Sequence, residues 1–520
     1  MKNANKCWHI IGARNKLCYN VVRKRVIGMI HLSDLQKYER CAALLWRSRH
    51  EPLTFFPFVH PCASMGELAI RYFDLKNYYE GKIGDAGSRA VQALQRYDAL
   101  VNARFEAQGV RIRITLMRRT AQGFDVYFGY RSCYPHESEA QKIADQLTVL
   151  QTLQIPVANV YILCLNADYI RKEHLNIKEL LLVSDRLFNQ KNKLRHTIRE
   201  LTTPLMRDLR EMSSNCESCI AQGSCPLIVR SQVCTRKGKC RYFDRCFPQQ
   251  LPDDSILYLQ QSAHKLEMYE EGIERLQDAD LDRVEGFRFQ FAQIRAAQNQ
   301  GFAFDECALR TWLVQNITYP ITYLDFEWDT YAIPPYEGMR PFDVLCFQYS
   351  MHIETEPDAP LLHREFLGEE DCRITFIEQL LRDLPSQGPI LVFNMEGAEK
   401  LRLIQLAEQF PIYEERLTSI CQRMIDLSLL FSAGVVHHVK MHGMYSLKTL
   451  LPIFSDHSYQ ELDISFGMDA VKEYRAMKQC TREERKKIKE QLLLYCGMDT
   501  YAEYVLLHGL ERLLQKKNGE

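Results

Sequence analysis

The chain has 520 residues, of which 46% are hydrophobic and 25% charged, a balance typical of a globular protein long enough for two to four domains. Lys and Arg total 66, as do Asp and Glu, so the net charge of zero excludes a global basic field that attracts nucleic acid. Any nucleic-acid binding therefore needs a local groove. No apolar run reaches the roughly 18 residues of a membrane helix, and we expect a cytoplasmic protein with no membrane partner.

Residues 1–28 contain Lys and Arg but no Asp or Glu. This composition is compatible with an organellar transit peptide. The alternative is an over-extended start or a loose tail, with Met29 opening the folded part. We favour the second interpretation and treat residues 1–28 as a tail.

The first half of the chain predicts an α/β unit. Amphipathic or charged helices are expected at 33–46, with Ser33 as the N-cap, and at 65–74, 88–107, 139–154 and 175–212. Strands are expected at 110–117, 124–130 and 157–165. We assign residues 29–212 to this domain and residues 213–250 to a Cys-rich metal-binding segment.

Residues 248–252 begin and end with proline and separate the two halves. Helices at 255–300 predict a helical linker over 251–310. The last domain, 311–520, is expected to have strands at 321–328, 342–353 and 389–394. Helices are expected at 371–384 and 397–410, and only helices after them, ending with a long one at 483–514.

Two short patterns in the last domain place acidic residues in step with the local structure. Asp325 and Glu327 lie two apart on an apolar strand, so both project to one face. Tyr495 and Asp499 lie four apart in a helical stretch and also share a face. Burying carboxylates in a core strand is costly unless they are paired or bind a cation. Carboxylates from two elements can hold two hard divalent cations.

Two further acids are candidates for the same site. Glu399 follows the strand end at Asn394 and could supply another carboxylate. Asp426 is the alternative, and a helix-start cap is an equally good interpretation of that residue.

Together these patterns resemble the DEDD superfamily of 3′–5′ exonucleases, in the subtype whose last motif is Tyr-x-x-x-Asp. The resemblance implies a ribonuclease H-like fold, with Asp325, Glu327 and Asp499 as metal ligands and Tyr495 orienting the attacking water. In that superfamily the second motif carries an aspartate. Glu399 is the closest match here, so this chain departs from the pattern at that position.

Further motifs narrow the resemblance to the bacterial family known as domain of unknown function 2779. They are Ile333-Pro334, Pro341-Phe342, Phe347 to His352, Ser446-Leu447-Lys448, Tyr459 to Leu462 and Tyr495-Cys496. The resemblance spans roughly residues 29–512 and implies no settled biological role.

Six of the 18 cysteines crowd into residues 216–246, and in a large chain such clustering favours metal ligation over disulfides. Zinc and iron–sulfur clusters usually need four thiolates. Either a distant ligand such as Cys41 completes one triad, or each triad is completed by a separate ligand. The triads are Cys216, Cys219 and Cys225, and Cys234, Cys240 and Cys246.

One early cysteine followed by a late triad resembles the iron–sulfur staple of RecB-type nucleases. The first triad fits the spacing of the AddAB type, and the second fits the unknown-function family better. We predict a [4Fe–4S] cluster on Cys41, Cys234, Cys240 and Cys246. The first triad, Cys216, Cys219 and Cys225, is a candidate zinc site whose fourth ligand is open.

A RecB-type domain implies a PD-(D/E)XK nuclease site on the strands at 110–131. Gly129 and Arg131 occupy the places of its Glu and Lys, and Asp125 is the nearby carboxylate. Gln146 matches a glutamine that the type carries. We therefore expect a degenerate nuclease domain. Its arginines either bind the phosphates of nucleic acid or are simply scattered over the surface: Arg111, Arg113, Arg118, Arg119 and Arg131.

The combined expectation is an α/β protein with a ribonuclease H-like C-terminal domain and a RecB-like N-terminal domain. Its predicted function is a metal-dependent 3′–5′ exonuclease that acts on DNA or RNA at a single-stranded 3′ end. The predicted cofactors are two Mg²⁺ or Mn²⁺ ions on Asp325, Glu327, Glu399 and Asp499. One alternative is a catalytically inactive iron–sulfur adaptor that binds nucleic acid, and another is a redox or iron sensor.

Overall fold

The computed structural model describes residues 29–235, 240–248, 250–357 and 359–517, and the chain forms two compact units. The first unit contains residues 62–169 and 175–229 and the segment that ends at Thr54. The second contains the chain from Arg230 onward with the short segments Phe55–Pro61 and Ile170–His174. The predicted tail, residues 1–28, lies outside the described residues.

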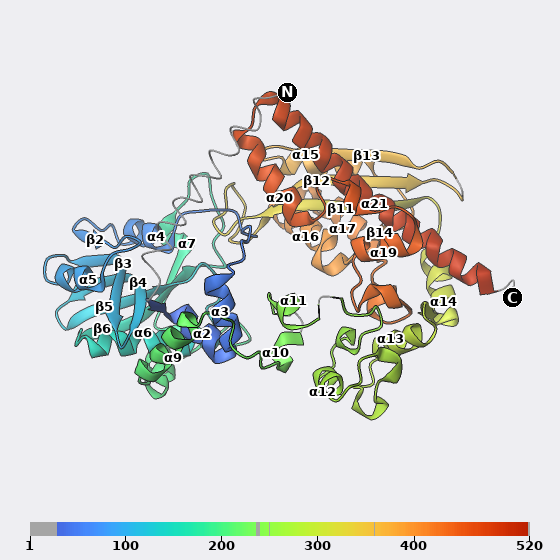
Figure 1. The fold of residues 1–520 in the computed structure, drawn as a ribbon. Helices are drawn as coiled ribbons and strands as arrows, with labels where there is room; N and C mark the ends of the chain where they lie inside the picture. Colours follow the sequence, from blue (N-terminus) through green and yellow to red (C-terminus); the bar gives the residue numbers. More distant parts are fainter. Residues whose placement is uncertain (1–28, 236–239, 249, 358, 518–520) are drawn as a thin grey trace, which may run out of the picture. The chain divides into compact units, whose positions relative to one another are not determined.

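A seven-stranded mixed sheet forms the centre of the first unit, in the order β2-β3-β4-β5-β6-β7 with β1 beside β4 (Figure 1). The antiparallel meander β3-β4-β5 is followed by helix α6 (Ala140–Thr152), and β6 then lies parallel to β5. The strands are β1 (Ile30–His31), β2 (Tyr78–Glu80), β3 (Ala99–Ala107), β4 (Val110–Thr120), β5 (Gly123–Gly129), β6 (Val157–Leu165) and β7 (Leu181–Ser184).

The remaining elements of the first unit are short. A separate hairpin pairs β8 (Arg186–Phe188) with β9 (Leu194–Thr197). The helices are α2 (Leu32–Arg40), α3 (Ala42–His50), α4 (Met65–Tyr72), α5 (Gly87–Ala93), α7 (Ile177–Leu180), α8 (Ile198–Thr202) and α9 (Arg210–Ala221).

Three helix predictions in this unit were wrong in part. The helix expected at 33–46 is two helices, because Cys41 is extended with φ −175° and ψ 124°, and His31 rather than Ser33 is the N-cap residue. The second half of 88–107 is strand β3, and 175–212 contains β7, β8 and β9. In the last two cases pairing within a sheet overrides a helix-like composition.

The second unit contains a five-stranded sheet in the order β13-β12-β11-β14-β15 (Figure 1). β11, β12 and β13 are antiparallel neighbours, and β14 and β15 are added parallel to β11. The strands are β11 (Ile321–Thr330), β12 (Val344–Glu354), β13 (Leu362–Leu367), β14 (Ile390–Val392) and β15 (Met424–Asp426). A small second sheet pairs β10 (Phe302–Phe304) with β16 (Val436–His438). The expectation of helices alone after residue 410 was wrong, because β15 and β16 lie there.

Helices cover both faces of the five-stranded sheet. The longest, α21 (Arg482–Lys517), has 36 residues and packs on β11 and β12. The other helices of the second unit, not all of which lie on this sheet, are α10 (Gln232–Thr235), α11 (Phe243–Cys246), α12 (Lys265–Glu270), α13 (Arg288–Gln298), α14 (Glu306–Asn316), α15 (Arg373–Asp383), α16 (Glu399–Gln409), α17 (Glu414–Arg423), α18 (Leu429–Ser432), α19 (Leu447–Phe454) and α20 (Gly467–Ala476).

The alternation of side chains along β11 decides which residues face α21. Leu324 and Phe326 pack into the apolar layer that α15, α16 and α17 form on one face. Ile321 and Tyr323 pack against Leu507 of α21 on the other. Asp325 and Glu327 continue this second series. In the described part of the chain, no helix is both long and apolar enough to cross a membrane.

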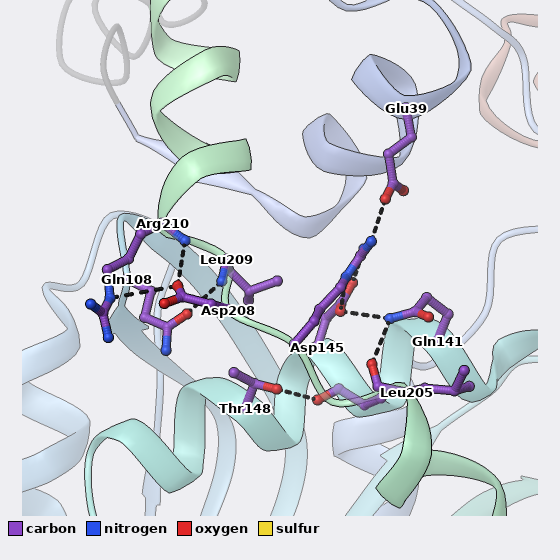
Figure 2. A network of polar contacts seen from close by, with 11 residues as sticks. Glu39, Gln108, Gln141, Asp145, Thr148, Leu205, Asp208, Leu209 and Arg210 are labelled. Atoms are coloured by element: carbon purple, nitrogen blue, oxygen red, sulfur yellow. Dashed lines mark hydrogen bonds and ion pairs between the residues drawn. The ribbon is translucent and has the colours of Figure 1, made fainter.

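An ion-pair network ties the first unit together around Asp145 of α6 (Figure 2). Asp145 is buried, and both of its carboxylate oxygens accept hydrogen bonds from Arg207 at 2.9 Å. Arg207 also donates to Glu39 of α2 at 2.5 Å, and Gln141 of α6 donates to Asp145. The network therefore links α2 and α6 to the segment before α9.

Replacing Arg207 should destabilise the first unit. In Arg207→Met the buried Asp145 loses its cation, and we expect unfolding to become easier by about 3 kcal/mol in urea titrations. The matched control is Arg210→Met, because Arg210 and Asp208 form an exposed pair at 3.5 Å whose loss should cost less than about 1 kcal/mol. Equal effects of the two substitutions would contradict the importance of the network.

Candidate metal centre

The structure brings together acids that are far apart in the sequence. One ligand atom each from Asp325, Glu327 and Asp499 lies within 4.8 Å of the others. Among the residues that the structure describes, no other group of three His, Cys, Asp or Glu side chains has its ligand atoms this close together. Strand β11 and helix α21 therefore bring together the acids whose spacing along the sequence predicted a shared face.

Regular geometry of two rigid elements positions these side chains. β11 lies between β12 and β14 in the sheet, so its backbone is hydrogen-bonded on both sides. Its pairing with β12 is irregular between Glu327 and Trp328, immediately after the second acid. On α21, Tyr495, Asp499 and Glu503 follow one another at four-residue spacing and so form one stripe.

Burial and mutual repulsion make the ionised acids unfavourable in the absence of cations. Burial raises the pKa of Asp325 well above its usual range, and Asp499 raises it further. Glu327 shows the same rise from burial and from Asp325 and Asp499. Burial also raises the pKa of Asp499, although Lys448 and hydrogen bonds from Tyr459 and Tyr495 act in the opposite direction. Divalent cations would relieve this repulsion.

Glu399 lies outside the group of three acids that meet within 4.8 Å, but its carboxylate interacts electrostatically with Asp325 of that group. Glu399 opens α16 and is 1% exposed, and its pKa is raised by burial and then by Asp325. Its Oε2 atom has no hydrogen-bond partner. The Asp426 carboxylate instead accepts backbone N–H groups of Asn394, Met395 and Ser428 at 2.9–3.1 Å. Asp426 thus caps the local backbone. Of the two interpretations that the sequence left open, a site ligand or a cap, these hydrogen bonds favour the cap.

Glu503 is a fifth acid that the sequence analysis missed. It is 0% exposed, and neither carboxylate oxygen has a hydrogen-bond partner. Burial raises its pKa well above the usual range, and Asp325, Glu399 and Asp499 raise it further. Its place four residues after Asp499 was the signal that could have identified it. We refer below to Asp325, Glu327, Glu399, Asp499 and Glu503 as the acidic site.

Two residues at the edge of the site were noted only as parts of family-like motifs. Tyr459 donates a 2.6 Å hydrogen bond to Oδ1 of Asp499. Lys448 donates a 2.7 Å hydrogen bond to the hydroxyl of Tyr495. Tyr495 is 2% exposed, and burial followed by the charge of Asp499 raises its pKa well above the usual range.

Cys41 lies near the first of the two cysteine triads. Helix α9 packs on α2 and α3, and Cys219 lies 3.4 Å from the carbonyl oxygen of Ala42. Burial, then Cys225, and more weakly Cys41 raise the pKa of Cys219. Cys216 is fully buried on the same helix. The first triad and Cys41 therefore belong to one part of the first unit.

The second triad lies in the second unit. Cys234 and Cys246 pack against an apolar cluster that includes Phe243 and Phe247. The backbone N–H of Cys240 donates to the carbonyl of Cys234 at 3.4 Å. The pairing of Cys41 with Cys234, Cys240 and Cys246 stays a prediction.

At Gly129, where a PD-(D/E)XK nuclease would carry its glutamate, the neighbouring side chains fill the available space. A Cβ atom at Gly129 would lie 2.6 Å from Cγ2 of Thr115 and 2.8 Å from Cβ of Met65. Asp125 accepts a hydrogen bond from Asn159 at 2.8 Å. Gln146 donates to the carbonyl of Arg113 at 3.1 Å, which gives it a structural role. An acidic side chain at position 129 would need its surroundings to shift.

Several of the candidate phosphate-binding arginines already have partners. Arg111 pairs with Glu106, and Arg119 donates to the backbone carbonyl groups of Leu94 and Tyr97. Arg118 lies over the ring of Phe73 at 4.5 Å. Arg113 and Arg131 are exposed.

Residues 322–446 match the model of a family described as Domain of unknown function (DUF2779). The matched range contains Asp325, Glu327 and Glu399 and ends before Lys448, Tyr495 and Asp499. It supports the resemblance to this family over the five-stranded sheet. No curated protein and no solved structure matches the chain.

The raised pKa values predict an inverted pH dependence for the metal-free protein. Between the ordinary carboxyl pKa of about 4 and the raised native values, the folded state binds more protons than the unfolded state. The protonated acids therefore stabilise the folded state at low pH, and this stabilisation is lost as the pH rises through this window. In a chelator, thermal scans from about pH 5 to about pH 8 should show Tm falling by about 5 °C relative to the double variant Asp325→Asn, Asp499→Asn.

Added Mn²⁺ should reverse this loss in the unsubstituted protein, because the cation binds the ionised acids of the folded state. The double variant serves as the control and should respond little to Mn²⁺. The same pH dependence of Tm in both proteins would contradict the coupling of these acids.

Proposed function

We propose that the second unit is a metal-dependent 3′–5′ exonuclease that hydrolyses terminal phosphodiesters of DNA or RNA. The observation that carries the proposal is the convergence of Asp325, Glu327 and Asp499 within 4.8 Å, beside the buried Tyr495. The topology supports it, because an antiparallel meander with two parallel strands added beside β11 is expected of a ribonuclease H-like fold.

The donor set fits hard divalent cations. Carboxylate oxygens are the ligands that Mg²⁺ and Mn²⁺ prefer. Asp325, Glu327 and Asp499 would hold them, with Glu399 supplying a further oxygen from its unpaired Oε2. Two such ions would stabilise the attacking and leaving oxygens of a phosphodiester.

The residues around the acids would orient the reactants. Tyr459 donates a hydrogen bond to Oδ1 of Asp499 and would hold this carboxylate in one orientation. Tyr495 places its hydroxyl beside the acids and would orient the attacking water. Glu399 enters from α16, and the charge of Asp325 acts on its carboxylate. The proposed substrate is a single-stranded 3′ end.

We further propose that the first unit binds nucleic acid and no longer cleaves it. Gly129 stands where an acid would be required, and its surroundings leave no room for a side chain. The exposed Arg113 and Arg131 are available for phosphate contacts.

Purified protein with Mn²⁺ should shorten a 3′-extended, 5′-labelled oligonucleotide one nucleotide at a time. Asp325→Ala and Asp499→Ala should each lower kcat by at least about 10³-fold, because each removes a ligand of the cations that would stabilise the transition state. Gel analysis of the products measures both the direction and the rate.

Glu399→Gln should reduce the rate as well, and Glu396→Gln is its control, because Glu396 is exposed and pairs with Lys400. Cleavage that persists in both Asp325→Ala and Asp499→Ala would refute the proposal. Tight binding without cleavage, independent of cations, would support the inactive adaptor.

We also propose that Cys41, Cys216, Cys219 and Cys225 form the four-thiolate site for an iron–sulfur cluster. The position of Cys41 beside α9 supports this set over the one with Cys234, Cys240 and Cys246. Four thiolates suit a [4Fe–4S] cluster.

Anaerobically purified protein should contain about four iron atoms per chain and absorb visible light. Cys219→Ser should abolish both, and Cys240→Ser should leave the iron content unchanged, as measured by metal analysis. The opposite pattern would return the cluster to the second triad.

A further inference from the structure

Lys448 is the cation that faces the acidic site. It is the second residue of α19, whose N-cap Ser446 accepts a hydrogen bond from the backbone of Thr449 at 3.3 Å. Leu447, Leu450 and Leu451 of this helix are buried, so the backbone that carries Lys448 is anchored.

The ammonium group is surrounded by aromatic rings. Its Nζ atom lies 5.0 Å from the ring centroid of Tyr495, 5.4 Å from that of Tyr459 and 5.8 Å from that of Phe466. Such contacts stabilise a cation and restrict its movement. Lys448 therefore has a defined position beside the acids.

The hydrogen bond from Lys448 decides what the Tyr495 hydroxyl can do. At 2.7 Å, Nζ donates to Oη and occupies one acceptor position of the hydroxyl. The O–H of Tyr495 must then point elsewhere, and the neighbouring acceptor is the Asp499 carboxylate. Lys448 thus holds Tyr495 as a donor directed at the acidic site.

The charge of Lys448 acts on the same acids that would bind cations. It favours the ionised forms of Asp325, Glu327 and Asp499. A fixed positive charge so close also repels any divalent ion bound there. The action of Lys448 on cations depends on its charge, whereas its action on Tyr495 depends on a hydrogen bond, so the two can be tested separately.

We propose that Lys448 is a positioning residue of this site, which orients the Tyr495 hydroxyl for the reaction and weakens the binding of divalent cations by its charge. The first role rests on the proposed function. The second does not, because cation binding can be measured without substrate.

The test compares Lys448→Met, Lys448→Arg, Tyr495→Phe and the double variant Lys448→Met, Tyr495→Phe. Lys448→Met should bind Mn²⁺ at least about threefold more tightly in calorimetry, and Lys448→Arg should stay close to the unsubstituted protein because it keeps the charge. Lys486→Met is the matched control, since Lys486 is exposed on α21 and pairs with Glu490. Unchanged Mn²⁺ affinity in Lys448→Met would overturn the charge effect.

In the exonuclease assay, Lys448→Met should lower kcat about 10- to 100-fold with KM changed less than about twofold. The same substitution should have no further effect in the Tyr495→Phe background, because its action passes through that hydroxyl. An equal loss in both backgrounds, or a rise in KM alone, would overturn the positioning role. No cleavage by the unsubstituted protein would refute the proposed function, while the Mn²⁺ measurement would still decide the charge effect.

Discussion

The arrangement of the second unit depends on the burial of carboxylates that repel one another. Moving even one ionised carboxylate from water into a protein interior costs several kcal/mol unless a counter-charge accompanies it. Here Glu399 and Glu503 are almost completely inaccessible, and Asp325 lies beside both. A fold that keeps these groups together without a function would be under continuous strain. The proposed binding of cations would account for the arrangement.

The acids can be held in place because each one comes from an element that packing fixes independently. β11 is paired on both edges, and its alternate residues Leu324 and Phe326 are buried in the opposite apolar layer. α21 is anchored along its length, with Leu492, Leu506 and Leu510 fully buried. The free energy of these apolar contacts offsets the repulsion at the site. Hydrogen bonds from Tyr459 and Lys448 then fix the remaining freedom of Asp499 and Tyr495.

Local periodicity predicted the parts of the site that lie on regular elements. Two-residue spacing paired Asp325 with Glu327, and four-residue spacing paired Tyr495 with Asp499, because strand and helix geometry fixes which side chains share a face. The choice between Glu399 and Asp426 depended on which carboxylate receives backbone N–H groups, and no local pattern contains that information. Residues 99–107 were misassigned for a related reason. Their Ala, Leu, Arg and Glu content favours a helix. They nevertheless form the buried strand β3, because they pair with β2 on one side and with β4 on the other.

The charges of the site bear on how many cations it would hold. If all five carboxylates, on Asp325, Glu327, Glu399, Asp499 and Glu503, were ionised, they would carry a charge of minus five, against the positive charge of Lys448, which acts on Asp325, Glu327 and Asp499. One divalent ion would leave a net charge of minus two in a largely buried space, whereas two would bring the sum to zero. A neutral interior is strongly favoured where the effective dielectric constant is low. The buried Glu503, which a site with four acids would not need, and Lys448, which a site with one ion would need less, are both accounted for by two ions.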